Sequence, residues 1–135
     1  MCPSAPWNSE GGKVFGVVGG DARAPKVLFL KQMIAPSKEL ADRLGGVAPE
    51  EVFRVAAPCA GSGCGHHDAS AQRCNLVGKI VQDAAPVVDD YSVCPIRATC
   101  LWWAQEGPNA CLRCPQIATR NRLLGEELTR AATLD

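Results

Sequence analysis

The chain has 135 residues, of which 47% are hydrophobic and 21% are charged, ordinary values for a globular protein. Its 14 basic and 14 acidic residues cancel, so the overall charge does not favour nucleic-acid binding, which usually shows as a strongly basic face. No apolar run approaches the roughly 18 residues of a membrane span, and the start of the chain lacks the basic and apolar stretches of a secretory signal. We therefore expect one soluble, cytoplasmic domain over residues 1–135 that does not bind membranes.

Residues 13–58 contain no cysteine and predict a conventional scaffold. Runs rich in β-branched and aromatic residues at 13–18 and 26–34 predict two strands, joined by a loop too long for a two-residue hairpin. Gly19 and Gly20 fit a turn in this loop, because no lysine-bearing glycine-rich loop surrounds them, and we expect no nucleotide site.

Two short helices are predicted next in the scaffold. Ser37 is a suitable N-cap for a helix that ends at Gly45-Gly46. Pro49 suits the first position of another helix, and the carboxylates after it suit the positive end of the helix dipole. The apolar run at 52–57 fits either a helix or a strand.

The part of the chain from 59 to 135 predicts helices between cysteine-bearing loops. Helical spacing of apolar residues favours helices at 75–84, 95–106 and 116–132, with a linker at 85–93. The predicted fold class is therefore α+β: a small N-terminal β-hairpin and helix scaffold (13–58), followed by a cysteine-rich, mainly helical metal-binding half (59–135).

The cysteines are the most informative feature of the sequence. Seven of the eight lie between Cys59 and Cys114, and in a reducing compartment such a cluster favours metal ligands over disulfides. Cys2 is isolated near an end of the chain that we expect to be mobile, and we do not count it as a ligand.

The second cysteine block follows the spacing C-x5-C-x10-C-x2-C. If Cys94 caps the predicted 95–106 helix, its thiolate is stabilised at the positive helix end, and Cys100 follows on roughly the same side. The loop after the helix brings two more cysteines back toward Cys94 and Cys100. We predict that four thiolates bind one cofactor here: Cys94, Cys100, Cys111 and Cys114.

The first block has the spacing C-x4-C-x9-C and interleaved glycines, which permit tight wrapping and let amides face sulfur. Its candidate metal ligands are Cys59, Cys64 and Cys74, with His66 or His67 as a possible fourth. Two alternatives remain: both histidines are solvated or hydrogen-bonded to Asp68, or three cysteines hold a cluster with one open iron site.

Iron–sulfur chemistry is favoured over zinc by the spacing. Structural zinc sites usually draw cysteines from paired short knuckles, whereas this chain has a single C-x2-C and otherwise irregular gaps. Arg97 and Arg113 could offset the negative charge of a cluster. Trp102 and Trp103 could exclude water from it, although core packing is the simpler role and at most one of the two can face the cluster squarely.

The segment Cys94-Pro-Ile-Arg-Ala-Thr-Cys100-Leu-Trp-Trp-Ala104 resembles the cluster-binding segment of the WhiB-like 4Fe-4S proteins, which carry C-P-V-R-x-x-C-L-x-W/Y-A. The resemblance implies a 4Fe-4S cluster with Cys94 and Cys100 as ligands. Tyr91 stands where that family has a further cysteine, so Cys111 and Cys114 would complete the set. The family's Gly-Val-Trp-Gly-Gly turn is missing, and we do not transfer its transcriptional role.

These observations favour a small iron–sulfur protein, with one 4Fe-4S cluster or two metal sites, that acts in electron transfer or redox sensing with a redox or regulatory protein partner. Two alternatives stay open. One is an enzyme whose cluster has an open iron site, and the other is a zinc-stabilised interaction module without redox chemistry.

Overall fold

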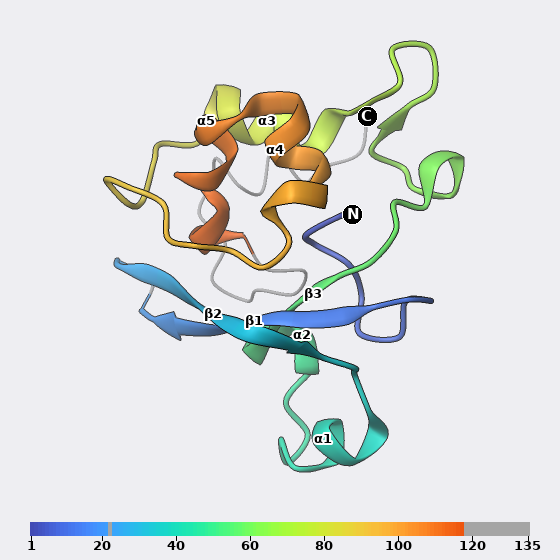
Figure 1. Ribbon diagram of the computed structural model, residues 1–135, viewed down its shortest axis with the longest axis vertical. Coiled ribbons are helices and arrows are strands. Elements are labelled where there is room, and N and C mark those ends of the chain that lie inside the picture. The colour runs from blue at the N-terminus through green and yellow to red at the C-terminus, as the bar shows by residue number, and fades with distance from the viewer. Residues whose placement is uncertain (22, 118–135) are drawn as a thin grey trace.

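The computed structural model describes residues 1–21 and 23–117, and its fold class is α+β, as predicted (Figure 1). A three-stranded antiparallel sheet lies under a layer of short helices that contains most of the cysteines. The predicted helix at 116–132 lies outside the described residues except for Gln116 and Ile117.

The sheet has the strand order β2-β1-β3. Strands β1 (Lys13–Gly20) and β2 (Pro25–Ile34) form the predicted hairpin. Its last pair is Gly20 with Pro25, so the loop between the strands is longer than two residues, as expected. Gly20 has a φ of +69°, and a Cβ atom there would lie 2.1 Å from the carbonyl oxygen of Ala24, so the turn requires glycine. Strand β3 (Phe53–Ala56) pairs antiparallel with β1, which resolves the ambiguous 52–57 run as mainly strand.

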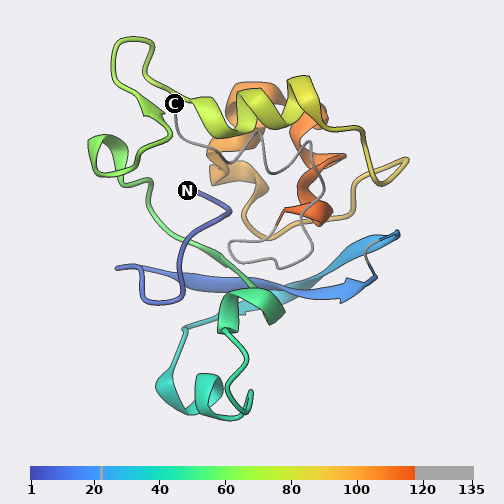
Figure 2. The same ribbon diagram turned by 180° about the vertical axis from the view of Figure 1, so that it is seen from behind.

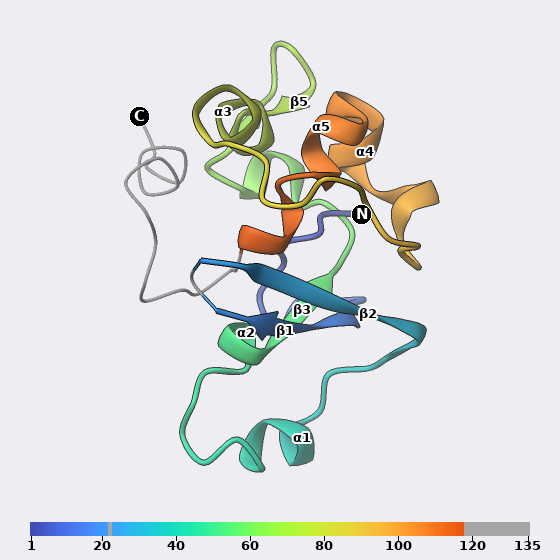
Figure 3. The same cartoon turned by 90° about the vertical axis from the view of Figure 1, so that its left-hand side faces the viewer.

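Helices lie on both sides of the sheet (Figure 3). The predicted scaffold helices are present as α1 (Lys38–Asp42) and α2 (Pro49–Val52), and the Ser37 hydroxyl accepts a 3.1 Å hydrogen bond from the Leu40 amide. On the other face lie α3 (Asn75–Asp83), α4 (Leu101–Glu106) and α5 (Pro108–Cys111), together with a small β4–β5 ribbon of His67–Asp68 and Arg73–Cys74.

The prediction of one continuous helix over 95–106 is wrong in its first half. Residues Arg97–Thr99 form a 3-10 turn, and Cys100 has extended backbone angles, φ −73° and ψ 122°. The α-helix therefore starts at Leu101, with Cys100 rather than Cys94 at its N-cap. Local helical spacing cannot foresee this break, because buried Ile96 packs with sheet residues Phe15 and Ala56 in a separate core cluster.

The helical layer, which Figure 2 shows from behind, has its own hydrophobic core. Val77 and Ile80 of α3 pack with Trp102 of α4 and Ala110 of α5. This confirms the packing role expected for one of the adjacent tryptophans.

The first residues of the chain are tied between the sheet and the helical layer. The Cys2 amide donates to the Ala57 carbonyl at 2.7 Å, and the Ala57 amide returns a bond to the Cys2 carbonyl at 3.1 Å. The Leu101 amide donates to the Met1 carbonyl at 2.8 Å. Cys2, which we expected at a mobile end, is therefore paired through its backbone with the segment that follows β3.

Within the described ranges, no helix is long and apolar enough to cross a membrane.

Candidate metal centre

The eight cysteines are free thiols that line two cavities, four in each. The first cavity has a volume of about 310 Å³ and is lined by what we call the first quartet: Cys94, Cys100, Cys111 and Cys114. The second cavity has a volume of about 280 Å³ and is lined by the second quartet: Cys2, Cys59, Cys64 and Cys74. Trp102 lines both cavities.

The structure thus brings the four cysteines of the second sequence block together, though not by the predicted continuous helix. Cys94 precedes the 3-10 turn Arg97–Thr99, and Cys100 caps α4. Cys111 ends α5, and Cys114 begins the last described 3-10 turn, Cys114–Gln116. Cys100, Cys111 and Cys114 therefore stand at the ends of short helical elements, and Cys94 lies three residues before one.

Arg54 supplies a buried positive charge beside the first quartet. Its side chain on β3 is 1% exposed, and Nη2 lies 3.2 Å from the Cys114 sulfur. Nη1 donates to the Cys114 carbonyl at 2.7 Å, and Nη2 also donates to the Pro3 carbonyl at 3.0 Å. No carboxylate of the described residues forms an ion pair with this guanidinium. A buried cation is costly unless its donors are satisfied, and here the two terminal nitrogens bind two carbonyls and the Cys114 sulfur.

Three buried N–H groups of the described residues have no hydrogen-bond partner: Arg54 Nε, Arg97 Nε and Trp102 Nε1. Arg97 and Trp102 line the first cavity, and Arg54 contacts Cys114 of the first quartet. Buried donors are almost always satisfied in folded proteins. Unused donors around a sulfur-lined cavity fit an acceptor in that cavity, such as the sulfide or thiolate sulfurs of a cluster.

Arg97 and Arg113 differ in their relation to the cavity. The Arg97 guanidinium lies 4.6 Å from the Tyr91 ring centroid and 5.5 Å from that of Trp103. Its charge also opposes the rise in the pKa of Cys111 that burial causes. Arg113 instead donates to the carbonyls of Ala84 and Asn109, so it ties the end of α3 to α5.

Burial is the main influence on the ionisation of three thiols of the first quartet. It raises the pKa of the Cys94, Cys100 and Cys111 thiols, and nearby quartet thiols add to the rise. The amides of Trp102 and Trp103 at the start of α4 oppose this shift at Cys100. Without a metal these thiols hold their protons at neutral pH, so metal binding would release protons.

Backbone amides face sulfur in the second cavity. The Gly61 amide lies 3.4 Å from the Cys59 sulfur, and the His66 amide lies 3.5 Å from the Cys64 sulfur. Of the three interleaved glycines, Gly61 has a positive φ, at +56°. The glycine-rich sequence therefore does let the chain turn its amides toward sulfur, as expected.

The two histidines also line the second cavity. Burial, and the charge of Lys79, lower the pKa of His66, which favours a neutral imidazole. Asp68 Oδ1 is engaged by Ser70 and the Ala71 amide within its own turn.

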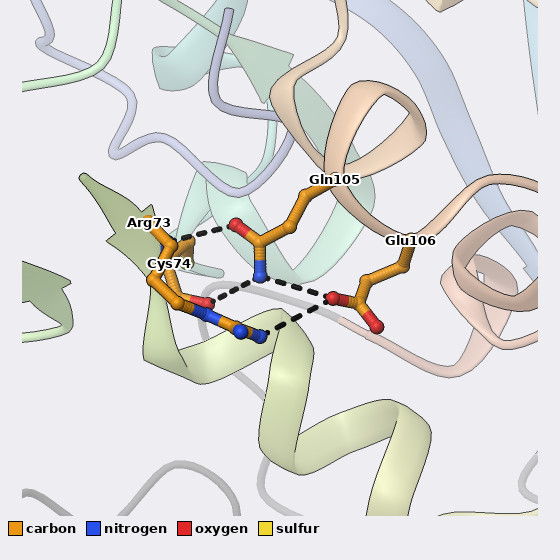
Figure 4. Close-up of polar contacts among 4 residues, drawn as sticks. All are labelled: Arg73, Cys74, Gln105 and Glu106. Atoms are coloured by element: carbon orange, nitrogen blue, oxygen red, sulfur yellow. Dashed lines mark hydrogen bonds and ion pairs between the residues drawn. The ribbon is translucent and has the colours of Figure 1, made fainter. Parts of the chain in front are cut away.

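Gln105 clamps the backbone of Cys74 to α4 (Figure 4). The Cys74 amide donates to Gln105 Oε1 at 2.9 Å, and Gln105 Nε2 donates to the Cys74 carbonyl at 2.9 Å. Glu106 extends the contact, because it accepts from Gln105 and pairs with Arg73 at 3.4 Å. The second cavity is thereby attached to helix α4, which has Cys100 at its N-cap.

Within the described residues, no three His, Cys, Asp or Glu side chains lie close enough together to hold a single metal ion. The chain matches no family model, and no curated protein or solved structure is significantly similar to it.

Sequence reasoning missed three residues of these sites: Cys2, Arg54 and Gln105. Cys2 is far from the other cysteines in sequence, and Arg54 interrupts an apolar strand without a local reason. An arginine within a strand rich in apolar residues is the one signal that could have drawn attention to a buried charge.

Proposed function

We propose that this chain is a small iron–sulfur protein that binds a 4Fe-4S cluster through Cys94, Cys100, Cys111 and Cys114, and that it transfers single electrons or senses redox state with a protein partner. The observation that carries the proposal is the quartet of cysteines around one cavity with the buried Arg54 guanidinium against the Cys114 sulfur.

The size of the first cavity supports a cluster over a single ion. Zinc binds thiolates at about 2.3 Å, which draws four sulfurs tightly around one point. A cavity of about 310 Å³ is instead some ten times the roughly 30 Å³ that one water occupies in the liquid. Such a space has room for a group of several atoms beside the four thiols.

The charge around the first cavity supports the same conclusion. A cluster bound by four thiolates is anionic, and the guanidinium groups of Arg54 and Arg97 both face its ligands. Hydrogen bonds to sulfur and nearby charge are the features by which proteins set cluster potentials. The unpartnered Trp102 Nε1 is a further donor to such a cluster.

Exposed apolar side chains near the first cavity support a protein partner. Leu28 lines the cavity and is 63% exposed, and Val93, next to Cys94, is 89% exposed. An apolar rim beside a redox group is a suitable contact for a protein that exchanges electrons with it.

Single variants prepared anaerobically test the proposal. We expect Cys94→Ala to lose the iron and the visible absorption that depend on the first quartet, while Ser92→Ala, two residues away, keeps both. Equal iron and absorption in the two variants would contradict the assignment. A colourless wild-type protein with stoichiometric zinc would favour the zinc-stabilised interaction module instead.

A further inference from the structure

We infer that the second cavity is a second iron–sulfur site, in which Cys2, Cys59, Cys64 and Cys74 bind a 4Fe-4S cluster and neither histidine is needed as a ligand. The inference shares the chemistry of the proposed function, but it does not depend on a cluster in the first cavity.

Backbone pairing holds Cys2 at this cavity. The reciprocal bonds between Cys2 and Ala57 place it beside the chain that continues through Pro58 to Cys59. The Met1 carbonyl accepts from the Leu101 amide, which joins the same segment to the start of α4. Cys2 is therefore positioned from two sides, by the sheet and by the helical layer.

The other three cysteines reach the cavity from two separate parts of the chain. Cys59 and Cys64 flank the 3-10 turn Gly61–Gly63, and Cys74 ends strand β5. Pairing of His67 with Cys74 in the β4–β5 ribbon, and the Gln105 clamp, fix Cys74 opposite the Cys59–Cys64 loop. Ligands that come from several directions are what a bulky cluster requires.

Backbone amides point toward sulfur in the second quartet. The amides that face the Cys59 and Cys64 sulfurs add the hydrogen bonds typical of cluster ligands.

Cys2 supplies a fourth thiol to a site for which the sequence left open a histidine ligand or an open iron position. With three cysteines, the site needs a histidine as fourth ligand or leaves one iron open. Because Cys2 lines the same cavity, all four positions of a cubane have a thiol. Trp102 lines both cavities, so the two sites are neighbours across one indole ring.

Iron and sulfide counts after anaerobic reconstitution of the full chain with ferrous iron and sulfide test the inference. We expect the wild type to hold about eight iron atoms, four for each cluster. Cys2→Ala and Cys94→Ala should each lose up to half of the iron, and the double variant nearly all of it. If Cys2→Ala loses a single iron, we expect the electron paramagnetic resonance signal of a three-iron cluster. His66→Ala and His67→Ala are matched controls in the same cavity and should keep the full count.

Each result decides between the two proposals. Full iron in Cys2→Ala overturns the second site, and so does loss of iron from either histidine variant. Zinc that survives reconstitution in Cys94→Ala but is lost in Cys2→Ala also overturns it, because a zinc ion then occupies the second cavity. If instead Cys94→Ala keeps all iron while Cys2→Ala loses all of it, the second site stands and the proposed function of the first quartet fails. Far-ultraviolet circular dichroism of Cys2→Ala, compared with that of the iron-free wild type, tests whether the variant still folds. Cys2→Ser is a second variant, for which we expect altered cluster absorption.

Discussion

Replacement of Arg54 by methionine removes the buried charge beside the first quartet and keeps a side chain of similar length. In the wild type, Nη2 lies 3.2 Å from the Cys114 sulfur, and the side chain is 1% exposed. An electron added to the cluster is stabilised by this cation. We therefore expect Arg54→Met to shift the reduction potential to a more negative value.

The magnitude follows from Coulomb's law. Two unit charges at 3.2 Å interact by about 5 kcal/mol at an effective dielectric constant of about 20. The added electron spreads over the cluster, which roughly doubles the mean separation and leaves about 2–3 kcal/mol. For a one-electron couple this corresponds to a shift of about 100 mV.

Protein-film voltammetry, or a redox titration followed by visible absorption, measures this shift. Arg54→Lys should retain much of the charge and shift the potential less than half as far. Lys13→Met is the matched control, because it removes an exposed cation from the same sheet. Equal potentials for Arg54→Met and Lys13→Met, in proteins with equal iron, would refute the role of Arg54.

Three further predictions concern stability and the second cavity. Gln105→Leu removes both hydrogen bonds to the Cys74 backbone, so it should lower the free energy of unfolding in denaturant by about 1–3 kcal/mol and reduce the iron of the second cavity first. Gln105→Glu keeps one acceptor and should lose less stability and less iron. Equal losses in the two variants would contradict the clamp. Burial raises the pKa of Cys2 from 9.0 to about 11, so between these pH values the native iron-free chain keeps a thiol proton that the unfolded chain releases. The contribution of this proton to the free energy of unfolding is complete below pH 9 and is lost toward pH 11. The same alkaline loss of stability in Cys2→Ser would contradict the role of the Cys2 thiol. Gly20→Ala should lower the free energy of unfolding by about 1–3 kcal/mol, because the added Cβ would clash with the Ala24 carbonyl oxygen. The iron content should not change. An unaltered melting temperature would contradict the requirement for glycine in this turn.

Much of the scaffold could be predicted from the sequence because its signals are local. Alternating β-branched residues, the Ser37 cap and Pro49 each act within a few residues of the element that they define. The 52–57 run could not be decided locally, since a short apolar run fits a helix or a buried strand. Pairing of β3 with β1 decides it, and that contact joins distant parts of the chain.

The sites were predictable to the extent that their cysteines are close in sequence. The spacing predicted that Cys94, Cys100, Cys111 and Cys114 share one centre. In the structure these cysteines line one cavity, and the chain between them forms a 3-10 turn and the short helices α4 and α5 instead of one helix. The place of Cys2 in the second cavity was not predictable, because it depends on a β-bridge to Ala57, two residues before Cys59 and distant from Cys2 in the sequence. Arg54 was missed for the same reason, since its partner Cys114 is distant in the chain.

The most direct test of the central claim is the amount of acid-labile sulfide in the anaerobically purified wild-type protein, counted together with iron. Inorganic sulfide is a component of an iron–sulfur cluster and is not part of a zinc site with cysteine ligands. We predict sulfide and iron in equal amounts, about four of each for every filled cavity. Bound zinc without sulfide, in a protein that takes up neither iron nor sulfide on reconstitution, would contradict the account.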